Sequence, residues 1–265
     1  MQSSASPSIG HLEQIWRSLS ELCSGLSDEE WMRPTGCPGW SVQDNVAHLV
    51  DYEWRALGRP APAGQAVPRP NTRNALGESN EVGVEHRRGR RGEEVLAELQ
   101  EVTTARTAQL HALSEDDLLT EVATPAGPGT VASMLRLRVM DTWAHEQDIR
   151  RALARPGHDR GPAVQEAVGH LAGFLPVIAA KRAGAPDGTV VVLEVDGVHR
   201  STVEVVDGRG RTADPDTGSW TVRLTMPSTT FVALVGGRSD APDDVAIEGD
   251  VQLGRRIVAA LGFMP

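Results

Sequence analysis

The spacing of hydrophobic residues changes near residue 160, and this change limits the folds open to the chain. From about Ile9 to Leu153, apolar residues recur every three or four positions, which is the period of an amphipathic helix. Beyond residue 160, β-branched residues alternate along stretches 189–195, 201–206 and 219–225, as they do in strands. A helical bundle followed by a smaller domain with a sheet is therefore predicted.

The first part of the chain predicts four long helical segments, at about 9–26, 41–57, 78–113 and 131–153. Ser41 and Asp44 form a capping pattern at the start of the second segment. The third segment has a candidate break near Arg87-Arg-Gly-Arg-Arg91. A Pro-rich loop is expected at 58–75 and a turn at 124–129.

The second part predicts a small antiparallel α+β domain, which follows a helix at about 162–183. The dipeptides Asp196-Gly197 and Asp207-Gly208 stand between the first strands, where hairpin turns are required. A helix at 228–235, a short strand at 245–247 and a helix at 251–261 complete this domain. We place the domain boundary between residues 157 and 158, giving domains 1–157 and 158–265.

Composition and charge exclude several classes of partner. A net charge of −10 argues against binding to nucleic acid or to anionic membrane surfaces, because both are polyanions. The apolar runs, such as 174–180, are too short for a membrane span, and the first residues carry no signal-peptide pattern. We therefore expect a cytoplasmic monomer or homodimer in which the two cysteines, Cys23 and Cys37, are free thiols.

One pair of residues in the last bundle helix has the chemistry of a metal site. Asp141 and His145 are four residues apart, so that a helix stacks them on one face. His48 lies in another helical segment and supplies a candidate third ligand. Three protein ligands with a coordination position left open are typical of catalytic rather than structural zinc sites.

A plainer interpretation exists for each of these residues. An Asp and a His four apart can form a surface hydrogen bond, and a lone His in an apolar helix is commonly a hydrogen-bonded core residue. The metal interpretation is favoured because a carboxylate inside an apolar helix is costly to bury without a cation. Asp148 lies three residues after His145, where it either orients that imidazole or pairs with Arg151 at the surface.

Two stretches of the chain resemble the mycothiol-dependent maleylpyruvate isomerase family. They are Gly39-Trp40-Ser-Val-Gln-Asp44-Asn-Val-Ala-His48-Leu-Val50 and Arg138-Val-Met-Asp141-Thr-Trp143-Ala-His145-Glu-Gln-Asp148-Ile-Arg150. The resemblance covers nearly the whole chain. It implies a DinB-like four-helix bundle followed by a sterol-carrier-protein-like α+β domain, which the Glu248-Gly-Asp250 stretch fits.

The resemblance also implies a ligand set and two substrates. His48, Asp141 and His145 fall on the family's metal ligands, the metal being a divalent ion such as zinc. Mycothiol, the low-molecular-weight thiol of actinobacteria, would be the thiol cosubstrate. A single lysine, Lys181, among 26 basic residues is typical of the G+C-rich genomes of that group. Where the isomerase-type pattern has glutamate this chain has Asp141, whose side chain is shorter by one methylene.

The implied chemistry leaves two reactions open. Zinc lowers the pKa of a coordinated thiol, and the thiolate then attacks an electrophilic carbon. If the thiol is later expelled after bond rotation, the protein is a cis–trans isomerase, and if it stays, an S-transferase. Two rival functions remain: a non-catalytic ligand-binding or regulatory protein, which the shorter Asp141 keeps open, and a metal-dependent hydrolase with the same ligands.

Two arginines complete the predicted site as catalytic residues. Arg87, in the basic run, is a candidate for neutralising a substrate carboxylate or for binding the sugar part of the thiol. A solvated basic turn is the alternative for this run. Arg138 lies one turn before Asp141, where it either pairs with that carboxylate or points at the substrate. The sequence leaves both arrangements open.

Overall fold

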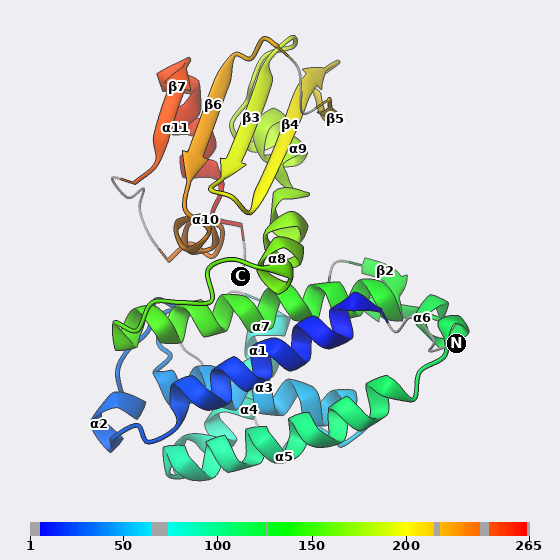
Figure 1. Cartoon of the computed structure of the whole chain (residues 1–265), viewed down its shortest axis with the longest axis vertical. Coiled ribbons are helices and arrows are strands. Elements are labelled where there is room, and N and C mark those ends of the chain that lie inside the picture. Colours follow the sequence, from blue (N-terminus) through cyan, green and yellow to red (C-terminus); the bar gives the residue numbers. More distant parts are fainter. Residues whose placement is uncertain (1–5, 65–73, 126, 215–217, 239–243, 264–265) are drawn as a thin grey trace. The chain divides into compact units, whose positions relative to one another are not determined.

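The structure of the chain is a computed structural model that describes residues 6–64, 74–125, 127–214, 218–238 and 244–263. The chain divides into two compact units, 1–157 and 158–264. The first is helical and the second contains a sheet, so the predicted fold class is confirmed (Figure 1).

The first unit is built around four long helices. They are α1 (Pro7–Cys23), α3 (Val42–Ala56), α5 (Gly92–His111) and α7 (Val131–Leu153). Helix α3 packs against both α5 and α7, and α1 packs against the same two helices. Shorter helices flank this bundle: α2 (Asp28–Trp31), α4 (Ala75–Arg88) and α6 (Glu115–Leu119).

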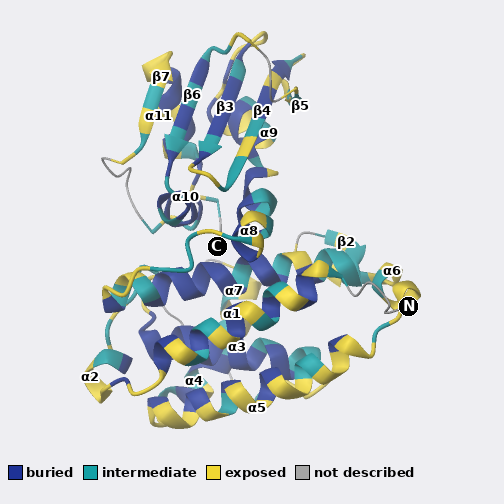
Figure 2. Ribbon diagram, in the orientation of Figure 1, coloured by how far each residue is buried: buried dark blue, intermediate teal, exposed yellow. Residues whose placement is uncertain are grey.

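Local sequence sets where the two helices of the candidate site begin. The Ser41 side chain accepts a hydrogen bond from the Asp44 backbone N–H, and the Asp44 carboxylate accepts one from the Ser41 N–H. This reciprocal box fixes the start of α3. Thr130 and Ser133 form a similar box at the start of α7. Most of α3, and α7 from about its middle onward, are buried (Figure 2).

The segment between α3 and α7 differs from the prediction in two details, the first being the short helix α6, which the sequence did not predict. The break expected in the basic run is present, because α4 ends at Arg88 and α5 begins at Gly92. The turn expected at 124–129 belongs to a hairpin of β1 (Glu121–Thr124) and β2 (Gly127–Thr130). Four-residue strands containing Gly and Pro have no alternating apolar pattern, so the sequence did not predict them.

The second unit is a five-stranded sheet with helices. The strands are β3 (Val190–Val195), β4 (His199–Val206), β5 (Arg209–Ala213), β6 (Val222–Met226) and β7 (Ala246–Gly249). The helical segments are α8 (Pro162–Ala172), α9 (Leu175–Val177), the π-helical turn η1 (Ile178–Arg182), α10 (Ser228–Val235) and α11 (Val251–Ala260).

The sheet is mixed, whereas the sequence predicted an antiparallel one. Its order is β5-β4-β3-β6-β7, and β3 pairs with β6 in parallel while the other neighbours are antiparallel. Strand direction cannot be inferred from alternation within one strand, because it depends on where the connection between strands leads the chain. Both expected turns are present, and Asp207 and Gly208 both have positive φ, as a type I′ hairpin turn requires.

The helical stretch 162–182 is long and apolar enough, by length and composition, to cross a membrane. This run is longer than residues 174–180, which by themselves are too short for a membrane span. Half of the 18-residue window that passes this test is buried inside the protein, and core helices of globular domains pass the same test. Here α8 contacts β4 and α10, and η1 contacts α11.

Candidate metal centre

The three predicted metal ligands converge between two adjacent helices of the first unit. His48 lies near the middle of α3, and Asp141 and His145 lie one turn apart on α7, which packs against α3. Among the described residues, this is a group of histidine and carboxylate side chains whose ligand atoms all lie within 4.8 Å of one another.

Both imidazoles approach the Asp141 carboxylate at distances close to those between neighbouring ligands of a metal ion. Nε2 of His48 is 3.4 Å from Oδ2 of Asp141, and Nε2 of His145 is 3.7 Å from Oδ1 of the same carboxylate. Ligands at about 2.1 Å from a tetrahedral zinc are roughly 3.4 Å apart. Both imidazoles are buried, while the Asp141 side chain is 20% exposed, so that the carboxylate borders solvent. The short side chain of Asp141 therefore reaches the imidazoles of both helices.

Asn45 decides which nitrogen of His145 carries a proton. Its amide nitrogen donates to Oγ1 of Thr35 at 3.0 Å and to the Ser41 carbonyl at 2.8 Å, so its oxygen must face the other way. That oxygen lies 2.8 Å from Nδ1 of His145. Since an amide oxygen can only accept, Nδ1 carries the hydrogen and a neutral ring presents the lone pair of Nε2 to Asp141.

A lone pair facing a carboxylate requires a positive charge between them. This charge is supplied either by a second proton on His145 or by a metal ion. A metal ion would also be bound by Nε2 of His48. Nδ1 of His48 is buried without a hydrogen-bond partner in the described structure, and Nε2 is the nitrogen directed at Asp141. Two imidazole nitrogens and one carboxylate are an ordinary zinc donor set, so these residues fit a divalent ion.

Trp40 forms a wall beside both imidazoles. Its ring centroid is 5.2 Å from that of His48 and 5.7 Å from that of His145. The indole N–H donates to the carboxylate of Glu81 at 2.9 Å, which holds the ring in place. The aromatic wall lowers the local polarity around the ligand atoms and thereby strengthens electrostatic interactions there.

Arg138 contacts the candidate ligand carboxylate directly. Its Nη1 donates to Oδ2 of Asp141 at 2.5 Å, and its Nη2 donates to Oε1 of Glu53 at 2.9 Å. The other oxygen of Glu53 accepts from Nε of Arg106 at 3.1 Å. Of the two arrangements that the sequence left open for Arg138, pairing with Asp141 is the one present.

This ion-pair chain keeps its members charged. Burial raises the pKa of Asp141, but the Arg138 guanidinium and the two imidazoles outweigh it, so that the pKa lies well below its usual range. Burial lowers the pKa of Arg138, but the carboxylates of Glu53 and Asp141 raise it by more, so that the pKa of Arg138 lies above its ordinary value. Asp141 is thus held as a carboxylate, the form that binds metal.

Arg87 lies in a different network, between α4 and α5. Its guanidinium donates to Glu98 at 2.8 Å and to the Gly83 carbonyl at 2.9 Å, and it lies 3.4 Å from Asp51. The side chain is buried rather than solvated. The contact of Arg87 with substrate stays a prediction. The hydrogen bonds to Glu98 and Gly83 do not favour it, because they occupy the guanidinium.

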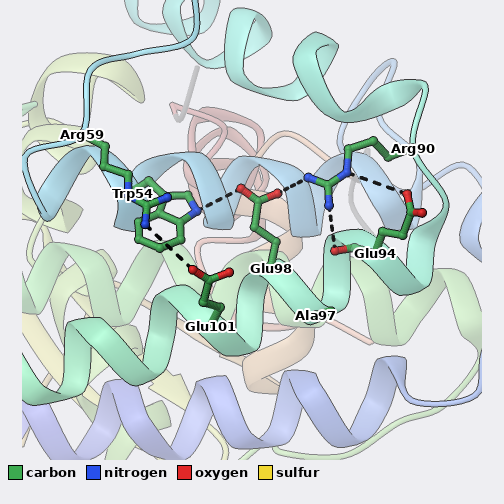
Figure 3. A pocket seen from close by; sticks show the side chains of 7 residues that line it. All are labelled: Trp54, Arg59, Arg90, Glu94, Ala97, Glu98 and Glu101. Atoms are coloured by element: carbon green, nitrogen blue, oxygen red, sulfur yellow. Dashed lines mark hydrogen bonds and ion pairs between the residues drawn. The ribbon is translucent and has the colours of Figure 1, made fainter.

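The same network lines a polar surface hollow of about 440 Å³. Figure 3 shows the Glu98 carboxylate between the Trp54 indole and the Arg90 guanidinium, both of which donate to it. Arg59 lies over the Trp54 ring, with its Cζ 3.1 Å from the centroid. The arginines of the basic run thus form ion pairs with carboxylates. The pair between Arg87 and Glu98 joins α4 to α5.

Three residues of the site were not predicted from the sequence: Asn45, Glu53 and Arg106. Asn45 and Glu53 are fully buried polar side chains on α3, on the same helix as His48. A polar residue within an apolar helical stretch was the available signal for both. Arg106 had none, because its pairing with Glu53 joins α5 to α3 across 53 positions of sequence.

Comparisons with known proteins identify the family of the chain. The family model for the mycothiol maleylpyruvate isomerase N-terminal domain matches residues 12–150, and that for the MDMPI C-terminal domain matches residues 166–256. Two uncharacterized proteins, each from a strain of Mycobacterium tuberculosis, are 27% identical over 184 residues, or 58% of this chain. The chain spans 60% of the length of these relatives.

The fold is also that of solved structures. Crystal structures of the mycothiol-dependent maleylpyruvate isomerase and of a histidine-to-alanine mutant of it give TM-scores of 0.57 and 0.56. Sequence identities are 16% and 18%, and each comparison covers 95% of this chain and 98% of the other. With both family models matched in order along the sequence, the chain belongs to the mycothiol maleylpyruvate isomerase family.

Proposed function

We propose that this protein is a metal-dependent enzyme that uses mycothiol as a nucleophile on a small electrophilic substrate. The observation that carries the proposal is the convergence of His48, Asp141 and His145, whose ligand atoms all lie within 4.8 Å of one another. Membership of the family supports the thiol as cosubstrate. Three protein ligands leave a coordination position for a thiol sulfur.

The chain's own residues prepare the site for this chemistry. Arg138 holds the Asp141 carboxylate, Asn45 fixes the tautomer of His145, and Trp40 covers the two imidazoles. A divalent metal such as zinc, when bound there, lowers the pKa of a coordinated thiol. The ligand set serves an isomerase and an S-transferase equally, and we propose maleylpyruvate-type isomerisation as the first reaction to test.

Metal analysis of the purified protein tests the site itself. We expect a stoichiometric divalent ion that is lost in His48→Ala and retained in His86→Ala, because His86 is exposed on α4 and belongs to no ligand group within the part of the chain that the structure describes. Both variants replace one helical histidine by alanine, so general effects of the substitution are matched. Equal metal content in the two variants would contradict the proposed ligands.

Thiol dependence tests the reaction. We expect the metal-loaded protein to turn over maleylpyruvate only when mycothiol is present, with activity lost in His48→Ala and kept in His86→Ala. Turnover that proceeds equally without the thiol would replace the proposal by metal-dependent hydrolysis or another thiol-independent reaction. Stoichiometric metal without thiol-dependent turnover of maleylpyruvate or of other electrophiles would favour a binding protein.

A further inference from the structure

A second cavity opens at the end of the bundle where α3 and α5 end and α7 begins. Its volume is about 300 Å³, at the lower end of the range for small-molecule sites. The strand β1 contributes to its wall through Val122. Most of its lining is apolar and comes from Leu110, Leu113, Val122, Val131, Met134 and Leu135.

The polar groups of this cavity already have partners. Arg106 donates through Nε to Glu53 and through Nη1 to the Gln109 side chain. The Tyr52 hydroxyl lies 3.1 Å from the sulfur of Met134. Burial raises the pKa of Tyr52, so this hydroxyl stays protonated and neutral at physiological pH. The cavity therefore presents a mostly apolar surface with a compensated charge, which suits an uncharged apolar group better than an anion.

The cavity is joined to the candidate metal centre by direct contacts. Tyr52 lies one helical turn after His48 on α3, and the Arg138 guanidinium stacks on its ring, 3.5 Å from the centroid. Arg138 in turn holds Asp141. Along α7, Met134 precedes Asp141 by two turns, or about 10 Å at 1.5 Å per residue. The cavity and the centre are therefore about two helical turns apart along α7, a separation that a molecule about 10 Å long would span.

We propose that this cavity is a binding subsite for an apolar group, a short aliphatic chain or a single ring, carried by the electrophilic substrate. The identity of the carrier rests on the proposed function, whereas binding of the apolar group does not. The subsite extends the proposed substrates beyond maleylpyruvate, a dicarboxylate without an apolar tail. It adds electrophiles with an uncharged apolar tail that runs from the centre between α3 and α7 toward the end of the bundle.

Tyr52 is the single tyrosine of the chain, which makes it a clean reporter. Protein labelled with 3-fluorotyrosine gives one fluorine NMR resonance, from the cavity wall. We expect 1-hexanol to shift this resonance in a saturable manner, and hexanoate at equal concentration to bind at least several-fold more weakly. Neither measurement requires metal or thiol, so failure of the proposed function would leave this result intact.

Two matched variants locate the binding. Ala56→Phe places a ring in the cavity, whereas Ala97→Phe makes the same change in the polar hollow of Figure 3. We expect the hexanol response to be lost in Ala56→Phe and kept in Ala97→Phe, with equal metal content in both. Absence of a saturable shift in the parent protein, or a response that survives Ala56→Phe in a folded protein, would overturn the subsite.

A kinetic arm links the subsite to catalysis. For electrophiles with an apolar tail, Ala56→Phe is expected to raise KM about tenfold or more, whereas Ala97→Phe, which lies outside the cavity, is expected to leave KM unchanged. Suppose that the parent protein is active and binds hexanol, but that Ala56→Phe and Ala97→Phe have equal KM values. The cavity would then bind apolar molecules without binding the substrate. That outcome would overturn the substrate class but not the proposed reaction.

Discussion

Asn45 orients an imidazole that a metal site needs in one tautomer. A buried amide with both of its hydrogens committed offers the histidine only an acceptor, and so the ring nitrogen that faces Asp141 is left without a proton. Histidines that bind metals generally donate their other N–H to such a partner. Asn45 is therefore a positioning residue, acting on the ion through His145.

Replacing Asn45 by leucine is expected to weaken metal binding about 10- to 100-fold, because the imidazole loses the partner that fixes its tautomer. Calorimetric titration of the metal-free protein with zinc measures the change in affinity. Asn80→Leu is the control, since Asn80 lies on α4 and contacts Arg55. The role assigned to Asn45 fails if both leucine variants, shown to be folded, bind zinc as tightly as the parent protein.

Among the elements, α4 is fixed to its neighbours largely through charged side chains. Glu98 on α5 accepts from the Arg87 guanidinium at 2.8 Å and also from Arg90. Burial raises the pKa of Glu98, but these two arginines outweigh it and hold the pKa below its usual range. Since Arg87 is buried, removing the carboxylate leaves a charge without its main partner, and this is costly.

Glu98→Gln is therefore expected to lower the free energy of unfolding by about 1–3 kcal/mol at pH 7. A carboxyl with a depressed folded-state pKa stabilises fully above its unfolded pKa of about 4.3 and loses this contribution as the pH falls through the folded value. The difference between parent and variant should therefore be constant at neutral pH and shrink below about pH 4.

Denaturant unfolding across this pH range provides the measurement, with Glu93→Gln as control. Glu93 pairs with Arg91 at 2.7 Å, but both side chains are more than 60% exposed, so the variant should match the parent protein within about 0.5 kcal/mol. A Glu98→Gln effect as small as that of Glu93→Gln would show that the ion pairs do not hold α4 in place.

At the scale of the whole molecule, every residue assigned to the metal centre lies in the first unit. His48, Asp141 and His145 fall within 1–157, as do Asn45 and Arg138, and this unit has its own buried core. We accordingly propose the boundary after residue 157 as a true domain boundary. The ligand geometry should then not depend on the second unit.

A fragment of residues 1–157 is expected to fold and to bind one zinc ion with an affinity within about threefold of that of the full chain, which corresponds to less than 1 kcal/mol. Circular dichroism establishes its helical content and calorimetry its affinity. If the fragment is helical but binds no zinc, the second unit contributes to the metal centre and the boundary does not separate independent domains.

Local pattern alone determined the order and type of most elements. Capping residues and three- to four-residue spacing predicted α3 and α7 close to their observed bounds, because these signals act within one helix. The spacing of Asp141 and His145 on one helix face follows from the same geometry. The direction of β6 and the β1–β2 hairpin escaped prediction, since each depends on chain segments that pair only after folding.

The metal centre was only partly accessible from sequence. Its candidate ligands could be named, but their convergence depends on the packing of α3 against α7, which brings residues 93 positions apart to 3.4 Å. Because Arg138 lies one turn before Asp141 on the same helix, the sequence offered this pair as one of two arrangements, whereas it named no partner for Arg87. The tertiary structure decided both cases, placing Arg138 against Asp141 and Arg87 against Glu98, because burial forces each charge to a carboxylate within reach.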